Sequence, residues 1–249
     1  MMTDADHNDA PVALVTGGAI RVGRGIAVAL ADAGYDVLIH YRKSEADVEK
    51  TRAEIESSGR RCATIQGDLL DDDTPVRLIY GAKQAFGRLD ILVNNASLFE
   101  PDPADAFTSE HWRRMMQINA IAPAALIESA TPLLEASNTG QVINLCDISA
   151  DRPWPTHRAY CASKAALANL TVSYARRLAP SIRVNGVAPG IAIFPDDYDE
   201  PTRQRLVAKV PLRREGTVED IAQAVRFLAE RGDYITGQIL RVDGGRSIV

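Results

Sequence analysis

Cysteine is scarce in this chain, whose 249 residues contain only Cys62, Cys146 and Cys161. An odd number of cysteines cannot form a complete disulfide framework, and none of them has the CxxC spacing of a zinc or redox site. We therefore expect three reduced thiols. The four histidines are scattered and form no HExxH or similar ligand pair, so the sequence predicts no metal site.

Long apolar runs and long basic runs are also lacking. No apolar stretch reaches the roughly 18 residues of a membrane span, and the acidic, polar start MMTDADHNDA is unlike a signal peptide. A formal net charge of -5 without a basic tract argues against a nucleic-acid surface. The sequence thus predicts a cytoplasmic protein that binds neither membranes nor nucleic acids.

The chain does contain a regular alternation of apolar, strand-like segments with amphipathic, helix-like ones. The seven strand-like segments lie at 12–16, 35–41, 61–67, 90–95, 141–146, 182–187 and 238–242. Strands without a polar alternation of their own are typical of a parallel sheet covered by helices on both faces. Because no linker or repeat divides the chain, we predict a disordered tail at 1–11 and one α/β domain at 12–249, a Rossmann-type doubly wound parallel sheet.

A glycine-rich turn, TGGAIRVG, follows the first predicted strand and precedes a helix, which is the order that a dinucleotide site requires. Gly17 would make the tight turn, and Gly23 would let the helix pack close to the strand, with helix N–H groups facing a pyrophosphate. After the second strand, HYRKS lacks the acid that accepts ribose hydroxyls in NAD-binding folds. Arg42, Lys43 and Ser44 suit a 2′-phosphate instead, so we expect NADPH.

A tyrosine and a lysine lie four residues apart in the helix-like segment 158–179. Residues at this spacing share a helix face, so Tyr160 and Lys164 point the same way. At about 4 Å and an effective dielectric of about 20, their attraction would reach about 4 kcal/mol. We therefore expect Lys164 to lower the pKa of Tyr160 and allow proton exchange near neutral pH.

Together these motifs resemble the short-chain dehydrogenase/reductase family from Val12 to Gly245, with TGGAIRVG, NNAS, Asn119, YCASK and VAPG as landmarks. The resemblance implies hydride transfer in which Tyr160 gives or takes the proton, Lys164 also holds the nicotinamide ribose, and Asn119 supports a proton-relay water. It also implies a homotetramer. Beyond the residues already named, the cofactor positions are Arg21, Val22, His40, Tyr41, Asp68, Leu69, Asn95, Ala96, Ser97, Pro189 and Gly190.

Two departures from the common family pattern resemble one branch, the pteridine reductases and the bacterial dihydromonapterin reductases. Arg21 replaces the middle glycine of TGxxxGxG, and Asp147 replaces the usual catalytic serine 13 residues before the tyrosine. In NNASLF, Phe99 stands where the pterin-stacking aromatic of that branch lies. Ala192 stands where pteridine reductases often carry a phosphate-contacting serine, so that contact is not expected here.

These substitutions suit the reduction of a pterin C=N bond, which needs a hydride at carbon and a proton at nitrogen. Asp147 could supply the proton directly or through water. Arg21 is long enough to reach a cofactor phosphate and the pterin edge, Phe99 could stack on the ring, and Ser97 could bind its aminopyrimidine side. The alternatives are a strand-end cap for Asp147, a phosphate-only role for Arg21, a core aromatic at Phe99 and a turn hydroxyl at Ser97.

The leading functional hypothesis is therefore an NADPH-dependent reductase of a dihydropterin such as dihydromonapterin, dihydrobiopterin or dihydrofolate. One alternative is a carbonyl reductase of 3-oxoacyl thioesters. In that case Asp147, or Ser149 after rotation, would have to take the role of the usual catalytic serine. A second is a non-enzymatic NADPH-binding regulator, against which the presence of the Tyr, Lys and Asn residues argues. The segment 191–205, rich in helix breakers, is predicted to be a substrate lid or an acidic surface loop.

Overall fold

The computed structural model describes residues 10–103, 107–194 and 198–249. Seven parallel strands form one sheet in the order β3-β2-β1-β4-β5-β6-β7. This arrangement confirms the predicted Rossmann-type doubly wound sheet. The strands are β1 (Val12–Thr16), β2 (Asp36–Tyr41), β3 (Cys62–Gln66), β4 (Ile91–Asn94), β5 (Gln141–Leu145), β6 (Arg183–Pro189) and β7 (Ile239–Val242).

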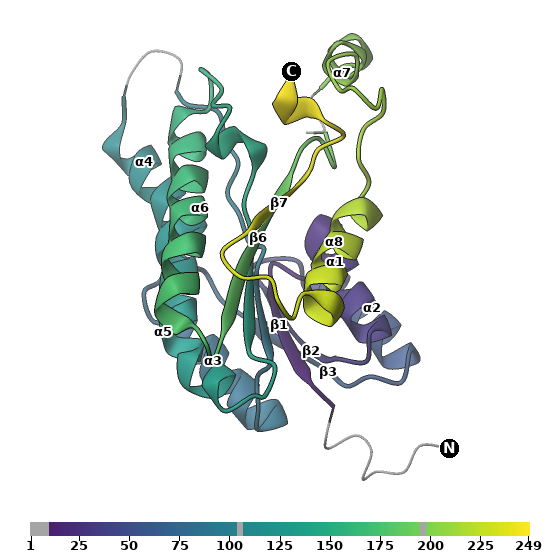
Figure 1. Cartoon of the computed structure of the whole chain (residues 1–249), viewed down its shortest axis with the longest axis vertical. Helices are drawn as coiled ribbons and strands as arrows, with labels where there is room; N and C mark the ends of the chain where they lie inside the picture. Colours follow the sequence, from purple (N-terminus) through teal and green to yellow (C-terminus); the bar gives the residue numbers. More distant parts are fainter. Residues whose placement is uncertain (1–9, 104–106, 195–197) are drawn as a thin grey trace.

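Helices cover both faces of the sheet, so the domain has three layers (Figure 1). One face carries α1 (Arg21–Asp32), α2 (Glu45–Ser57) and α8 (Val218–Arg231). The other carries α3 (Thr74–Phe86), α5 (Ala122–Glu135) and α6 (Arg158–Leu178), with α4 (Ser109–Met116) leading into α5. The short α7 (Glu200–Val207) lies near the C-terminal segment, beyond one edge of the sheet (Figure 1). Within the described ranges, no helix is long and apolar enough to cross a lipid bilayer.

The strands divide the apolar core into two parts by simple alternation. In β1, Ala13 and Val15 pack into the cluster beneath α1 and α8, whereas Val12 and Leu14 pack into the cluster beneath α3, α5 and α6. All four side chains are fully buried. Because both faces are covered, the strand needs no polar side, which explains why it reads as a continuous apolar run.

The first strand begins at Val12, as the sequence predicts, and the two residues before it are also packed against the domain. Residues 1–9 of the predicted tail lie outside the described residues. Ala10 is buried, and the carbonyl of Pro11 accepts a hydrogen bond of 2.9 Å from the backbone N–H of Asp36. These two residues therefore contact the domain, and the boundary at residue 11 stays a prediction.

The sheet order creates a crevice where the connections diverge, between β1 and β4. The two strand ends are fastened together there. The side-chain amide of Asn95 donates to the carbonyls of Thr16 (2.8 Å) and Gly17 (3.2 Å). The hydroxyl of Thr16 accepts from the N–H groups of Asn95 and Ala96, both at 3.0 Å. These bonds fix the turn after β1 against the segment after β4, and the candidate site opens directly above them.

Candidate active site at the carboxyl edge of the sheet

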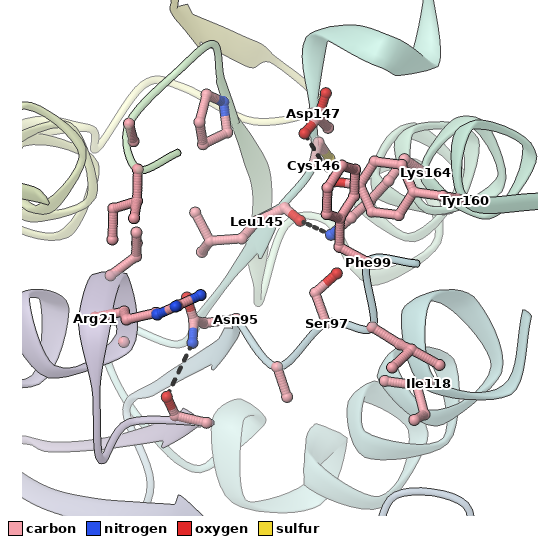
Figure 2. Close-up of a pocket in the computed structure, with 18 of the residues that line it drawn as sticks. Arg21, Asn95, Ser97, Phe99, Ile118, Leu145, Cys146, Asp147, Tyr160 and Lys164 are labelled. Atoms are coloured by element: carbon pink, nitrogen blue, oxygen red, sulfur yellow. Dashed lines mark hydrogen bonds between the residues drawn. The ribbon is translucent and has the colours of Figure 1, made fainter. Parts of the chain in front are cut away.

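A cavity of about 870 Å³ lies at the carboxyl ends of the strands (Figure 2). Tyr41, Lys43, Ser44 and Asn119 are the predicted site residues that do not line it. The predicted site residues that do line it are Gly17, Arg21, Val22, Gly23, His40, Arg42, Asp68, Leu69, Asn95, Ala96, Ser97, Phe99, Asp147, Tyr160, Lys164, Pro189 and Gly190.

The glycine turn has the geometry that the sequence predicts. Gly17 has a φ of +64°, which L side chains rarely adopt. At Gly23, an added Cβ would lie 2.0 Å from the carbonyl oxygen of Gly17 and 2.5 Å from the side-chain nitrogen of Asn95. Only glycine fits this position, so α1 can start directly against the turn. The space left beside the turn fits a dinucleotide phosphate.

Arg21 occupies a backbone conformation that normally favours glycine. Its φ is 51°, in the left-handed region, which costs a non-glycine residue about 1 kcal/mol or more. The side chain extends into the cavity beside Asn95 (Figure 2). A strained residue that lines a cavity is a reasonable starting point for a functional hypothesis, because the surrounding structure must hold it in place.

His40 links the ends of three strands. Its Nδ1 accepts a hydrogen bond of 3.3 Å from the N–H of Gly17, and its Nε2 lies 3.1 Å from the carbonyl oxygen of Gly67. Both contacts are satisfied only by the neutral tautomer with the proton on Nε2. Burial lowers the pKa of His40, which favours the same neutral form. Because both nitrogens are used within the protein, His40 supports the turn and has no free nitrogen for a cofactor.

The segment after β2 places one cation in the cavity. Arg42 lines it, with Nη1 3.7 Å from Oδ2 of Asp68, and both side chains are partly exposed. Lys43 lies outside the lining, on the exposed rim. Ser44 is the N-cap residue of α2, and in the described structure its side chain makes no capping hydrogen bond. A guanidinium thus lies within two residues of a hydroxyl at a helix N-terminus, an arrangement suited to a phosphate.

The side chains of Tyr160 and Asp147 meet in the cavity (Figure 2). The hydroxyl of Tyr160, in the first turn of α6, donates to Oδ2 of Asp147 at 2.7 Å. The other carboxylate oxygen, Oδ1, accepts from the backbone N–H of Ser149 at 2.7 Å and caps a short 3₁₀ helix (Ile148–Ala150). The strand-end cap considered for Asp147 is therefore present, but it uses only one of the two oxygens.

The predicted effect of Lys164 on Tyr160 is wrong. Burial, followed by the charge and hydrogen bond of Asp147, raises the pKa of Tyr160 well above its ordinary value. The Nζ of Lys164 lies 5.8 Å from the centroid of the tyrosine ring. Its ammonium donates instead to the carbonyl of Leu145 at 2.7 Å, and burial lowers the pKa of Lys164. The raised pKa favours the neutral phenol form of Tyr160.

Asn119 is completely buried and lies in a π-helical turn (Gln117–Ile121) before α5. Its amide nitrogen donates to the carbonyl of Leu98 and to the hydroxyl of Ser163, both at 2.9 Å. Its Oδ1 accepts from the N–H of Leu98 (2.8 Å) and the hydroxyl of Ser97 (3.1 Å). All four hydrogen-bonding positions of the amide are filled. The side chain therefore fixes the segment after β4, and the water-relay role stays a prediction.

An aromatic wall formed by Phe99, Trp154, His157 and Tyr160 bounds one side of the cavity. Phe99 stacks on His157, with centroids 4.6 Å apart, and meets Tyr160 edge-on at 4.8 Å. The Phe99 side chain is still 41% exposed. Sequence analysis missed His157 and Trp154. His157 is three residues before Tyr160, a helical spacing that could have revealed it, whereas no periodic signal marks Trp154.

The carboxylate of Asp102 fixes the position of this aromatic wall. Asp102 accepts hydrogen bonds from the N–H groups of Arg158 (2.8 Å) and Ala159 (3.2 Å), at the start of α6, and also from Nε of Arg158 (2.8 Å). Although burial opposes ionisation, these bonds hold the pKa of Asp102 below its ordinary value. The segment carrying Phe99 is thereby fixed against the helix that carries Tyr160.

The predicted lid contributes to the cavity, although its residues 195–197 lie outside the described ranges. Its lining residues are Ile191, Ala192, Ile193, Phe194 and Tyr198, and Leu206 of α7 also lines the cavity. The C-terminal segment adds Arg246, which sequence analysis also missed. Among the residues that the structure describes, no three His, Cys, Asp or Glu side chains converge as a metal site.

Several known proteins similar to this chain are named as reductases. A family model described as Enoyl-(Acyl carrier protein) reductase matches residues 18–247. The chain is 37% identical over 256 residues to a protein of Streptomyces violaceoruber named as ketoacyl reductase 2 of the granaticin polyketide synthase, with 100% of both chains covered. It is 35% identical over 237 residues to the 3-oxoacyl-(acyl-carrier-protein) reductase FabG of Staphylococcus aureus, covering 94% of this chain and 96% of that relative.

Among solved structures, FolM alternative dihydrofolate reductase 1 of Brucella suis, in complex with NADP, is similar to this chain. It matches with a TM-score of 0.89 and 34% identity, covering 98% of this chain and 97% of that one. The similarity therefore extends over the whole fold and includes every element that contributes to the cavity.

The first prediction concerns the glycine turn. Gly23→Ala places a methyl group on the carbonyl of Gly17, so we expect a loss of about 1–3 kcal/mol of unfolding free energy and of the thermal stabilisation by NADPH. Gly59→Ala is the control. Gly59 also has a φ that disfavours side chains (+81°), but it precedes β3 and so lies at the amino ends of the strands, away from the cavity. This variant should keep the NADPH-induced rise in Tm; an undiminished rise in Gly23→Ala would contradict the assignment.

The second prediction concerns His40. Its folded-state pKa is below its ordinary value of 6.5, so the unfolded chain takes up a proton first as the pH falls. The stabilisation is complete above about pH 6.5 and is lost as the pH falls further. Chemical denaturation across this range should show a smaller pH dependence in His40→Gln. His157→Gln serves for comparison, because burial also lowers the pKa of His157. An unchanged dependence of the unfolding free energy on pH in His40→Gln would refute the assignment.

Proposed function

This chain belongs to the short-chain dehydrogenase/reductase family, and we propose that it is an NADPH-dependent reductase of a dihydropterin. The observation that carries the proposal is the hydrogen bond between the Tyr160 hydroxyl and the Asp147 carboxylate in the cavity. A neutral phenol and a carboxylate that share a proton can protonate a ring nitrogen and then take up another proton. This is the chemistry that reduction of a C=N bond requires.

The cofactor fits the cavity on structural grounds. Gly17 and Gly23 occupy positions that disfavour a side chain, and the helix start that follows offers backbone N–H groups to a pyrophosphate. Arg42 and Ser44 support a 2′-phosphate, which favours NADPH over NADH. NADPH, when bound, supplies the hydride. The NADP complex of the Brucella suis relative is consistent with this assignment.

The pterin-binding assignment rests on three groups around the proton-transfer pair. Phe99 exposes part of its ring to the cavity while His157 covers one face, so the free side suits a flat heterocycle. Ser97 donates its hydroxyl proton to Asn119, so its oxygen is left to accept a hydrogen bond from an amino group. Arg21 extends toward the same space and suits a ring oxygen or a phosphate.

Reduction of a 3-oxoacyl thioester is the second candidate, because two curated relatives are named as reductases of that class. The local structure argues against it. Ser149, the residue that could replace the missing serine, is completely buried and does not line the cavity. Its backbone N–H is bound to Asp147, which holds Ser149 in the short 3₁₀ helix.

The third prediction tests the substrate class. The purified protein should oxidise NADPH with dihydromonapterin, dihydrobiopterin or dihydrofolate as acceptor, measured by the loss of NADPH absorbance. A short 3-oxoacyl thioester is the comparison substrate. Turnover of the thioester without turnover of any dihydropterin would overturn the proposal in favour of the second candidate.

The fourth prediction separates the two roles of Asp147. Asp147→Asn keeps an oxygen that can cap Ser149, whereas Asp147→Ser shortens the side chain; both remove the carboxylic acid. If the acid transfers protons, both variants should lower kcat for the dihydropterin by about 100-fold while NADPH affinity changes little. Near-normal activity in Asp147→Asn alone, or an equal loss of NADPH binding in both, would indicate a structural role.

The fifth prediction concerns the strain at Arg21. Arg21→Gly removes a left-handed arginine, so the unfolding free energy should rise by about 1 kcal/mol. The same variant removes a guanidinium from the cavity, so kcat/KM for the dihydropterin should fall. Denaturation curves and steady-state kinetics on one preparation give both values. A gain in stability without a loss of kcat/KM would show that the side chain has no role in the reaction.

A further inference from the structure

Arg246 lines the cavity but has no part in the proton transfer proposed above. It follows β7 and the DGG turn, and its side chain is half-buried. It also lines a second, smaller cavity of about 510 Å³, together with Lys209 and Arg213. The side chains described for that second lining include these three cations and no acid, and the last residue of the chain, Val249, also lines it. Arg246 thus stands between the reaction site and a cationic recess.

The guanidinium of Arg246 has no polar partner among the residues that the structure describes. Asp243, the nearest acid in the sequence, uses Oδ1 for the N–H of Gly245 (2.9 Å) and Oδ2 for the N–H of Ser247 (2.8 Å). The Arg246 side chain lies over the ring of Trp154, with Cζ 6.0 Å from its centroid, in a weak cation–π interaction. Other arginines form direct pairs, such as Arg214 with Asp220.

An unpaired, half-buried cation is costly unless something compensates it. Burial lowers the pKa of Arg246, and the charge of Asp147 is the largest effect that opposes this. Asp147 of the proton-transfer pair and Tyr198 of the lid line the same cavity as Arg246, and both act on its charge. A ring stacked on Phe99 next to Tyr160 would place its substituent on this lid side.

We propose that Arg246 binds an anionic group on the substrate side chain, so that the preferred substrate is a dihydropterin carrying a carboxylate. This inference rests on the proposed function. A guanidinium pairs with a carboxylate in a planar, two-bond geometry, and Trp154 supports the cation from one side. Lys209 and Arg213 in the adjoining recess would favour further negative charge along the same side chain.

The test measures binding, so that it does not depend on turnover. Folic acid, which carries carboxylates, and biopterin, whose side chain is neutral, are titrated by calorimetry onto the NADP⁺-saturated protein and its variants. Arg246→Gln should weaken folic acid binding by about 10-fold or more, as expected for a charge-assisted pair, and change biopterin binding by less than about twofold. Arg246→Lys, which keeps the charge, should recover part of the loss.

Arg231→Gln is the matched control, because it makes the same charge change on an exposed residue at the end of α8, outside both cavities. It should bind both ligands as the unmodified protein does. The inference is overturned if Arg246→Gln weakens both ligands equally, if it leaves folic acid unaffected, or if the unmodified protein does not bind folic acid. Failure of the proposed function differs from these results: folic acid would bind, but no dihydropterin would be reduced.

Discussion

The hydrogen bond between Tyr160 and Asp147 depends on the meeting of two segments, the end of β5 and the first turn of α6. Three further contacts hold these segments in place. Asp102 caps the start of α6, Asn119 ties the segment after β4 to Ser163 of α6, and Lys164 binds the carbonyl of Leu145 at the end of β5. Each contact comes from a different element, so the geometry of the pair is set before any ligand arrives. Such preorganisation is what proton transfer requires.

The electrostatic character of the cavity is opposite to that of the whole chain. The formal net charge of the protein is -5. The described cavity lining carries the cations Arg21, Arg42, Lys164 and Arg246 against only two carboxylates, those of Asp68 and Asp147. A locally positive cleft concentrates anions, and both the proposed cofactor and a carboxylate-bearing substrate are anionic. Asp147 is therefore a negative group in a cavity whose other charged side chains mostly favour the binding of anions.

The fold was predictable because buried parallel strands read as apolar runs, and the glycine turn because Gly23 admits no side chain. What could not be predicted depends on tertiary distances. The pKa of Tyr160 is raised by burial and then by the charge and hydrogen bond of Asp147, and no spacing in the sequence gives the depth of burial. Arg246 and Trp154 come from loops that only the folded chain brings together. The homotetramer, the preference for NADPH and the cytoplasmic location remain predictions.

The two departures from the common family pattern have the same physical character. Arg21 takes a backbone conformation that glycine adopts without strain, and Asp147 puts a carboxylate where a neutral hydroxyl would avoid the cost of desolvation. Each therefore costs stability and adds an ionisable group to the cavity. A carbonyl substrate, which needs one proton on oxygen, gains little from either group. A heterocycle with several ring nitrogens and an exocyclic oxygen can use both, so the combined cost is the strongest argument for a nitrogen-rich substrate.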